Sequence, residues 1–408
     1  MNTTEFRARA PLPYAEFVTL CALLMASTAF AIDIVLPAML VIGDALGAGN
    51  ENAAQWLVSA YLIPFAFGQL IFGPLADRFG RKPVVLFGIA VYTIASALSA
   101  FATDFTSLLI MRGIAGFGAA SGRVAVVAIV RDCFAGRDMA SVMSLVMMIF
   151  MVVPIIAPLA GQVLTEMISW HAIFGFMALF GLLLLTWIGL RLPETLNPEN
   201  RSPLGIRSLL HKLAIVFSNR TALFYALAMS IFFGSLFGFV NSAPQIYTQT
   251  YELGVWFPAA FSLGGAFVAV ASHANSTMVR RLGMRRLSHG ALLSFISLGI
   301  AMLAVSTLSD GNPHVTIVIA GTCAMFFCFG FIGTNFNALA MEPLGAHAGM
   351  ASAIFGFLQM AVAGSVGALI GQLYNGTAIP LLVGFVCCGL MSLGCVLWAE
   401  RGRLMIEA

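Results

Sequence analysis

The sequence predicts an all-α membrane protein with twelve transmembrane helices in two bundles of six. Of its 408 residues, 60% are hydrophobic and only 9% are charged, whereas soluble domains average about 45–50% apolar and about 25% charged residues. Apolar runs recur along the whole chain, and basic residues cluster between alternate pairs of runs. These observations indicate a polytopic membrane protein without a soluble domain.

Twelve stretches are long enough to cross a bilayer, because a helix needs about 20 apolar residues to do so. The first run is too long for the apolar core of a signal peptide, so we interpret it as a retained span. The predicted spans lie near residues 17–41, 53–75, 83–101, 106–130, 141–164, 172–192, 221–243, 255–279, 288–308, 314–338, 350–372 and 379–399.

Basic residues set the predicted orientation. With the N-terminus inside, 18 of the 20 Lys and Arg fall in inside loops and none falls in an outside loop. This is the positive-inside pattern, and one missed helix would scramble the alternation. We therefore expect both termini in the cytoplasm. The net charge of +3 reflects this topology and does not indicate nucleic-acid binding.

Three regions divide the chain: a six-helix half at 1–192, a cytoplasmic linker at 193–220 and a second six-helix half at 221–408. Within the linker, Ile206–Phe217 is either an amphipathic surface helix or a plain connection. The halves look related, because Asp77–Lys82 joins spans two and three while Arg280–Arg285 joins spans eight and nine. Two related halves are typical of secondary transporters, whose substrate site lies at the interface of the repeats.

Asp33 is the one acidic residue placed well inside a predicted span. A carboxylate in hydrocarbon is costly, so it normally faces a partner or a water-filled path. Arg112 lies within the fourth span, and both residues sit at a similar depth, roughly 10 Å from the outer face at 1.5 Å per residue. We therefore expect Asp33 and Arg112 to form an ion pair.

Two interpretations of this pair stay open. In the functional one, Asp33 carries a coupling proton, protonation weakens the pair, and a substrate competes for the exposed cavity. In the structural one, the pair only fixes helix packing. Arg123 lies on the same helical face as Arg112, eleven residues later. It either lines an inner cavity or extends to the inner membrane surface.

The loop between spans two and three has the sequence GPLADRFGRK. Its second glycine permits a tight turn, and its acidic residue can sit at a helix end near basic partners. The loop resembles the signature of the major facilitator superfamily. That resemblance implies a cytoplasmic gating role, without substrate contact, for Gly73, Asp77, Arg78, Gly80, Arg81 and Lys82.

Other stretches resemble one branch of that family, the Bcr/CflA-type drug:proton antiporters. Asp33–Pro37 resembles its element of an acidic residue followed by proline, and Arg112–Ala120 its span-four arginine motif, with Ala115 where glutamine is usual. Span five resembles the antiporter motif through Pro154, Pro158 and Gly161. Pro193–Thr195 fits the exit of span six, and Ala348–Gln359 fits span eleven. The resemblance implies efflux from the cytoplasm driven by proton entry.

Polar residues in other spans are candidates for a cavity lining or for interhelical hydrogen bonds; they are Tyr61, Gln69, Asn241, Asn335, Asn337 and Gln359. The seven cysteines match no metal spacing, and none lies in an outside loop, so we expect no structural disulfide. The sequence carries no nucleophile–base set, so we expect no catalytic residue and no enzyme activity.

Taken together, these patterns predict a proton-driven exporter of small amphipathic or apolar compounds, such as drugs or antibiotics. A proton-coupled transporter of a specific metabolite, such as a sugar or an amino-acid derivative, is the alternative. We expect a monomer in the bacterial inner membrane, with a small-molecule substrate and the lipid bilayer as its partners. Apart from the proton as coupling ion, we expect no cofactor and no metal.

Overall fold

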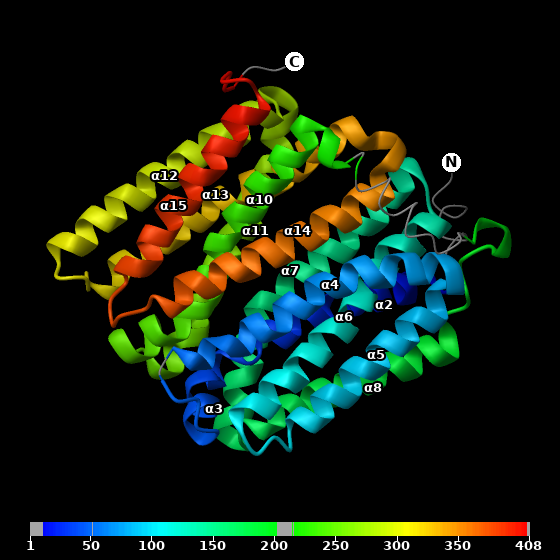
Figure 1. Cartoon of the computed structure of the whole chain (residues 1–408), viewed down its shortest axis with the longest axis horizontal. Coiled ribbons are helices and arrows are strands. Elements are labelled where there is room, and N and C mark those ends of the chain that lie inside the picture. Colours follow the sequence, from blue (N-terminus) through cyan, green and yellow to red (C-terminus); the bar gives the residue numbers. More distant parts are fainter. Residues whose placement is uncertain (1–10, 51, 202–213, 215, 406–408) are drawn as a thin grey trace. The chain divides into compact units, whose positions relative to one another are not determined.

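The computed structural model describes residues 11–50, 52–201, 214 and 216–405, and Figure 1 traces its helices. The chain forms two compact units. The first comprises Met1–Gly49 and Ala60–Ser208, and the second comprises Asn50–Ser59 and Leu209–Ala408. The division after Ser208 falls within the predicted linker, 193–220, whereas most of Ile206–Phe217 lies outside the described residues. Asn50–Ser59 differs from its expected place in the first half because its side chains bond to the second unit.

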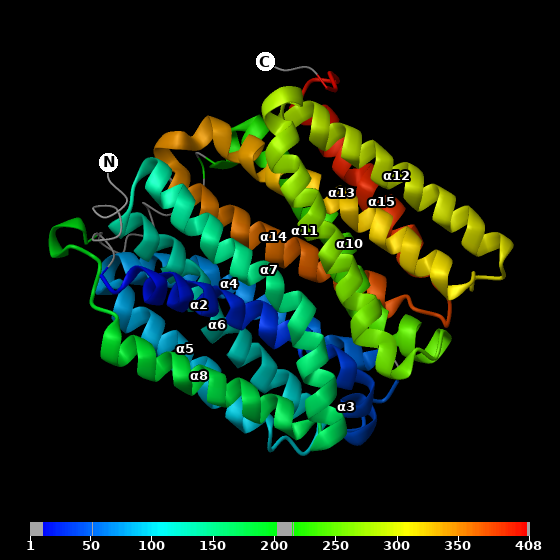
Figure 2. The same ribbon diagram turned by 180° about the vertical axis from the view of Figure 1, so that it is seen from behind.

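The helices of the first unit are long and antiparallel to their chain neighbours. They are α2 (Tyr14–Asp33), α4 (Trp56–Phe79), α5 (Arg81–Ser99), α6 (Phe105–Cys133), α7 (Gly136–Met167) and α8 (His171–Arg191). A short helix, α3 (Met39–Ala45), follows α2. The first turn of α4 belongs to the second unit. Helices α5 and α8 lie side by side in both views (Figures 1 and 2).

The second unit repeats the plan with six further long helices. They are α10 (Arg220–Pro244), which continues as a π-helical turn (Gln245–Thr250), α11 (Phe257–Leu282), α12 (Met284–Leu308), α13 (Val315–Met341), α14 (Ala348–Gln372) and α15 (Ile379–Ala399). Helix α10 packs against both α14 and α15.

Among the described residues, twelve helices are long and apolar enough to cross a membrane, which confirms the predicted number of spans. No β-strand occurs in the described part of the chain, so the all-α prediction is also confirmed. The first span is longer than predicted and runs from Tyr14 to Ala45, because the chain continues through a 3₁₀ turn and α3 after a break. The seventh extends to Thr250 through the π-helical turn.

Local sequence signals fix several helix ends. Asp104 caps α6 by accepting the backbone N–H of Ser107 at 2.9 Å. Asn219 caps α10 in the same way through Ala222. Capping residues of this kind satisfy backbone donors that the first turn of a helix leaves unpaired.

The internal repeat is visible in the backbone of the two basic loops. Gly80, between α4 and α5, has φ 108° and ψ 157°. Gly283, between α11 and α12, has φ 77° and ψ 159°. Only glycine adopts this region without strain. One glycine therefore makes the same turn at the equivalent place in each half.

Apolar packing between helices fills the interior of each unit. In the first unit, buried aliphatic residues from α2, α5, α6 and α8 form one cluster that includes Leu20, Ile89 and Ile188. In the second unit, phenylalanines pack on one another. The Phe232 ring lies 4.1 Å from that of Phe329 and 4.8 Å from that of Phe295, centroid to centroid. Many of the 34 phenylalanines thus pack against neighbouring helices.

Candidate functional site

Asp33 is the last residue of α2, at a break within the first span. Pro37 lies four residues later and has no N–H to donate to the Asp33 carbonyl, so the α-helix cannot continue through this point. The Asp33 residue is 7% exposed, and its side chain forms no ion pair or hydrogen bond with any described residue. A lone carboxylate at the negative end of a helix lacks the stabilisation that an anion gains at a helix N-terminus.

Arg112 lies on α6 and is completely buried. Its Nη1 donates to the backbone carbonyl of Ala31 at 2.9 Å. Its Cζ lies 4.7 Å from the centre of the Tyr61 ring on α4, within the range of a cation–π interaction. The Tyr61 hydroxyl comes near Thr28 on α2 but forms no hydrogen bond of ordinary geometry.

The expected ion pair between Asp33 and Arg112 is not among the ion pairs of the described residues. Asp33 and Arg112 do lie at a similar position along their helices, because Arg112 bonds to Ala31, only two residues before Asp33. The guanidinium instead takes a backbone oxygen and an aromatic face as partners. The prediction was wrong because the carbonyl of Ala31, on the same helix as Asp33, accepts a hydrogen bond from the guanidinium. The depth of a residue in a span carries no information about such a competing acceptor.

Gly161 connects the antiporter motif to the break in α2. Pro154 and Pro158 lie inside α7, and Gly161 follows on the same helix. A Cβ atom placed on Gly161 would overlap the carbonyl oxygen of Ile34, the residue after Asp33. Only glycine lets α7 approach the backbone this closely. The structure therefore brings the predicted coupling residue and the predicted antiporter motif together.

The gating motif forms a charge cluster at the ends of α4, α5 and α6. The Arg81 guanidinium pairs with Asp77 on α4, and its Nε donates to Asp132 at 2.9 Å. The Arg81 side chain is only 4% exposed, whereas Asp132 is 16% and Asp77 is 44% exposed. Asp132 is thus the more buried partner. Arg131–Asp132, at the inner end of span four, also resembles the branch, but the sequence does not identify the partner of Asp132, which lies 51 residues earlier in the chain.

Glu194, after the end of α8, caps the first turn of α5. Its carboxylate accepts the backbone N–H groups of Arg81 at 2.9 Å and Lys82 at 3.2 Å. A Cβ on Gly80 would overlap this carboxylate. Glycine at this position therefore permits the turn and also leaves room for the capping carboxylate. An anion at a helix N-terminus satisfies free donors and complements the helix dipole.

The remaining motif residues have weaker contacts. The Lys82 ammonium donates to the carbonyl of Gly189 on α8 at 2.9 Å. The Arg78 guanidinium lies 5.7 Å from the centre of the Phe79 ring. Gly73 leaves room that a methyl group would fill without overlap, because the nearest atom, on Val124, would be 3.9 Å away. Gly73 is therefore not required by close packing within the first unit.

The predicted cavity candidates have different environments. Asn335 on α13 donates to Asn275 on α11 at 2.8 Å, which is an interhelical hydrogen bond. Asn241 on α10 is fully buried, and no described residue is a hydrogen-bond partner of its side chain. Arg123 is half-buried on α6, and Gln359 is buried on α14.

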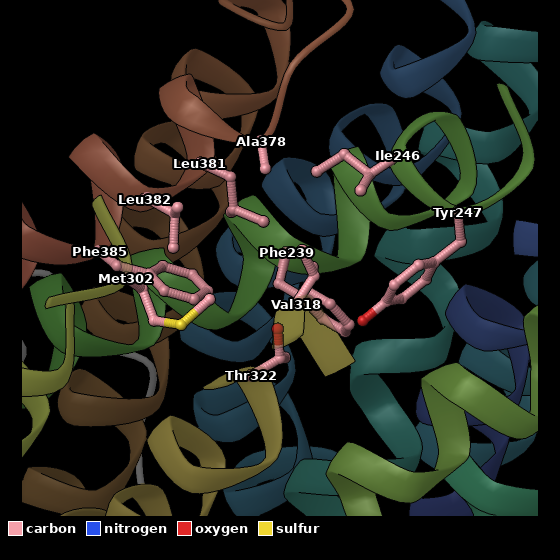
Figure 3. Close-up of a pocket in the computed structure, with 10 residues that line it drawn as sticks. All are labelled: Phe239, Ile246, Tyr247, Met302, Val318, Thr322, Ala378, Leu381, Leu382 and Phe385. Carbon is pink, nitrogen blue, oxygen red and sulfur yellow. The ribbon is translucent and has the colours of Figure 1, made fainter. Parts of the chain in front are cut away.

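A recess in the second unit is lined almost entirely by apolar side chains, and Figure 3 shows it. Its cavity volume is only about 10 Å³, which is about the space that one water molecule needs. Tyr247 and Thr322 supply its hydroxyl groups, and Phe239 and Phe385 contribute aromatic rings (Figure 3). None of the predicted cavity residues lines it.

Comparisons with known proteins agree with this architecture. The family model of the Major Facilitator Superfamily matches residues 20–368. A bicyclomycin resistance protein homolog of Haemophilus influenzae is 30% identical over 92% of this chain and 94% of its own length. The MFS-type transporter YdgK of Bacillus subtilis is 33% identical over 86% of this chain and 87% of its own. A chloramphenicol resistance protein of Pseudomonas aeruginosa is 30% identical, over 86% and 83%.

Solved structures share the fold. The xylose transporter XylE of Escherichia coli, in a partially occluded inward-open conformation, superposes with a TM-score of 0.72 at 13% identity, over 95% of this chain and 97% of its own. The human organic anion transporter MFSD10 gives 0.70 at 18% identity, over 95% and 99%. The family and fold are those of transporters rather than enzymes. The chain therefore belongs to the Major Facilitator Superfamily, and its resistance-protein relatives agree with the Bcr/CflA-type branch that its motifs resemble.

Proposed function

We propose that this transporter exports small amphipathic or apolar compounds, drugs and antibiotics among them, in exchange for protons. It acts as a monomer in a bacterial inner membrane, with both termini in the cytoplasm, and the proton is its coupling ion. The resistance proteins among its relatives support the substrate class. The basic loops support the orientation, because positive residues favour the cytoplasmic side.

One observation carries the coupling proposal. Asp33 is a buried acid at a helix break, and it has neither an ion pair nor a hydrogen bond among the described residues. A carboxyl group in such a place is most stable in its protonated, neutral form. Arg112 is near Asp33, because it donates a hydrogen bond to the carbonyl of Ala31, two residues before Asp33. An acid that is neutral in one state and charged beside a cation in another can carry one proton per cycle.

The contacts suggest how a proton would change the site. With Asp33 protonated, Arg112 keeps the Ala31 carbonyl and the Tyr61 ring, as described here. When Asp33 loses its proton, the new carboxylate attracts Arg112 away from these partners. Arg112 then releases Tyr61 and the α4 helix that carries it. Proton binding thereby acts on three helices, α2, α4 and α6.

The proton supplies enough free energy for export. One charge crossing a membrane potential of 100 mV is worth about 2.3 kcal/mol. Because about 1.4 kcal/mol corresponds to a tenfold concentration ratio, one proton per cycle supports a gradient of roughly fifty-fold.

The test compares Asp33→Asn with Asp44→Asn in proteoliposomes that carry an imposed proton gradient. Both changes replace a carboxylate by an amide, but Asp44 is an exposed residue on α3. We expect wild type and Asp44→Asn to accumulate a phenicol or bicyclomycin probe against its gradient, and Asp33→Asn only to equilibrate it. Gradient-driven accumulation by Asp33→Asn would place the coupling group elsewhere. A protein that moves a sugar or amino-acid derivative with protons, but no drug, would be the metabolite transporter instead.

A further inference from the structure

The basic end of the second unit carries an unbalanced positive charge. This is the end at which Gly283 joins α11 to α12. Its described residues include seven arginines and only two carboxylates, namely Arg220, Arg280, Arg281, Arg285, Arg286, Arg401, Arg403, Glu342 and Glu400. The corresponding end of the first unit has seven basic and six acidic described residues, namely Arg78, Arg81, Lys82, Arg131, Arg137, Arg191, Arg201, Glu16, Asp77, Asp132, Asp138, Glu194 and Glu199. The two ends are thus alike in basic residues but not in carboxylates.

Most arginines at this end of the second unit have no carboxylate partner. Arg285 is the exception, because its Nε donates to Glu400 at 2.7 Å and its Nη2 lies 3.8 Å from Glu342. The other six are exposed, and none of them forms an ion pair with a described residue. A preference for basic residues at one membrane face accounts for the arginines, but carboxylates contribute little to that preference. Membrane topology therefore does not explain the shortage of carboxylates.

Four of the exposed arginines gather where α10, α12 and α15 meet (Figure 1). Arg220, the first residue of α10, donates from Nη2 to the carbonyl of Ala399, the last residue of α15, at 3.0 Å. Arg286 on α12 donates from Nε to the carbonyl of Met405 at 3.3 Å. These two bonds attach the segment after α15 at both of its ends, and two further arginines lie within that segment. We call the four residues the arginine corner: Arg220, Arg286, Arg401 and Arg403.

An exposed tryptophan lies beside the arginine corner. Trp398 precedes Ala399 in the last turn of α15 and is 64% exposed. Its ring packs on Phe224 of α10, with 5.9 Å between the ring centroids. Tryptophan is enriched at the level of the lipid headgroups in membrane proteins. The corner therefore combines cationic groups with an aromatic surface of the kind that contacts lipid.

We propose that the arginine corner binds the phosphate of an anionic phospholipid, such as phosphatidylglycerol or cardiolipin, with an acyl chain against Trp398. Guanidinium groups match the geometry of phosphate oxygens through paired hydrogen bonds. Basic pockets between membrane helices are suited to anionic headgroups. The lipid supplies the negative charge that protein carboxylates supply in the first unit. A free phosphate ion would meet the arginines but would leave the aromatic surface unused.

The experiment measures lipid binding beside Trp398 through quenching of its fluorescence by brominated acyl chains. Phenylalanine replaces the other four of the five tryptophans, which are Trp56, Trp170, Trp187 and Trp256. The protein is reconstituted in phosphatidylcholine with increasing fractions of dibrominated phosphatidylglycerol, and quenching gives the binding constant of the anionic lipid relative to phosphatidylcholine. No drug and no proton gradient is needed, so the result is independent of the proposed export function.

A second single-tryptophan protein provides the spatial control. It keeps only Trp256, which is 69% exposed and precedes α11, at the end of the second unit remote from Gly283. Each protein must elute as a single peak on size exclusion before reconstitution. If a single-tryptophan protein does not fold, the difference in quenching between the native chain and Trp398→Phe or Trp256→Phe gives the same comparison.

Two variants remove charge from the corner, Arg403→Gln and Arg286→Gln/Arg403→Gln. The matched control, Arg131→Gln/Arg201→Gln, removes two exposed arginines from the first unit. One arginine near an anionic membrane surface is worth about fivefold in binding. We therefore expect the relative binding constant at Trp398 to fall about fivefold in the single variant and about 25-fold in the double variant. In the matched control it should stay at the parent value.

Three results would overturn the proposal. The first is a relative binding constant at Trp398 no larger than that at Trp256. The second is a constant that is unchanged in Arg286→Gln/Arg403→Gln, or that falls equally in the matched control. The third is displacement of brominated phosphatidylglycerol by excess inorganic phosphate, compared with chloride at the same ionic strength, because the corner would then be a site for a free anion. We expect phosphate and chloride to have equal effects.

Discussion

Replacing Gly80 with alanine tests whether the turn between α4 and α5 is required for the gating loop. Gly80 has φ 108° and ψ 157°, a region that is essentially restricted to glycine and costs other residues about 1–3 kcal/mol. The new Cβ would also overlap the Glu194 carboxylate. We therefore expect Gly80→Ala to carry two separate penalties, one in the backbone and one at the helix cap.

The magnitude follows from these two contacts. We take about 2 kcal/mol for the backbone strain. Displacing Glu194 from the amides of Arg81 and Lys82 loses an anion at a helix N-terminus, which is worth about 0.3–1 kcal/mol at an exposed position. The sum is about 3 kcal/mol, or a fall in melting temperature of roughly 6–12 °C for a unit of this size.

The assay is thermal unfolding of the purified protein, followed by the fluorescence of a thiol-reactive dye. Gly175→Ala is the matched control, because it adds a methyl group to α8 of the same unit where nothing lies within 4 Å. We expect this control to melt with wild type or slightly above it, since alanine is the better helix former.

A double variant separates the two penalties. Glu194→Ala alone should cost about 0.3–1 kcal/mol, and Gly80→Ala/Glu194→Ala should cost less than the sum of the single changes, because the overlap no longer exists. If Gly80→Ala melts together with Gly175→Ala, the left-handed turn is not required and the reasoning fails. Full additivity would show that Glu194 does not meet the new methyl group.

Three further predictions concern other contacts of the site. Asp132→Ala should destabilise the protein by about 2–3 kcal/mol in thermal unfolding, because the Arg81 guanidinium that it shares with Asp77 is buried. Asp77→Ala, at a half-exposed position, should cost under about 1 kcal/mol. Equal losses of stability in the two variants would contradict this prediction. Gly161→Ala should push α7 away from the break in α2, cost about 1–3 kcal/mol and reduce transport in proteoliposomes more than Gly189→Ala does. Asn335→Ala should cost about 0.6–2 kcal/mol with transport retained, and lost transport in a stable variant would instead mark a substrate contact.

Features that depend on the local sequence were predicted, and long-range pairings were not. The number of spans follows from apolar run length, and the glycine turn of the basic loop follows from one residue type, so both were within reach of sequence analysis. The bond between Gln55 and Gln245 joins residues 190 positions apart, and nothing in either local sequence identifies the other. Similarly, Asn335 was recognised as polar, but its partner Asn275 was not.

The error over Asp33 and Arg112 has a related cause. Depth in the membrane fixes one coordinate of a side chain, but rotation about the helix and competition from backbone oxygens decide its partner. Pro37 does predict the break in α2, because its missing N–H lies opposite the Asp33 carbonyl. A break exposes carbonyl groups, and Arg112 takes one of them, at Ala31. The sequence thus contained the cause of the break but not the identity of the cation's partner.

Helix α4 connects the site around Arg112 with the charge cluster around Arg81. Its second turn places Tyr61 against Arg112, and its last turn presents Asp77 to Arg81. Because a single helix of 24 residues carries both contacts, a displacement of α4 at Tyr61 would also change the position of Asp77. Loss of a proton from Asp33 that draws Arg112 from Tyr61 would therefore also affect the charge cluster around Arg81, through α4.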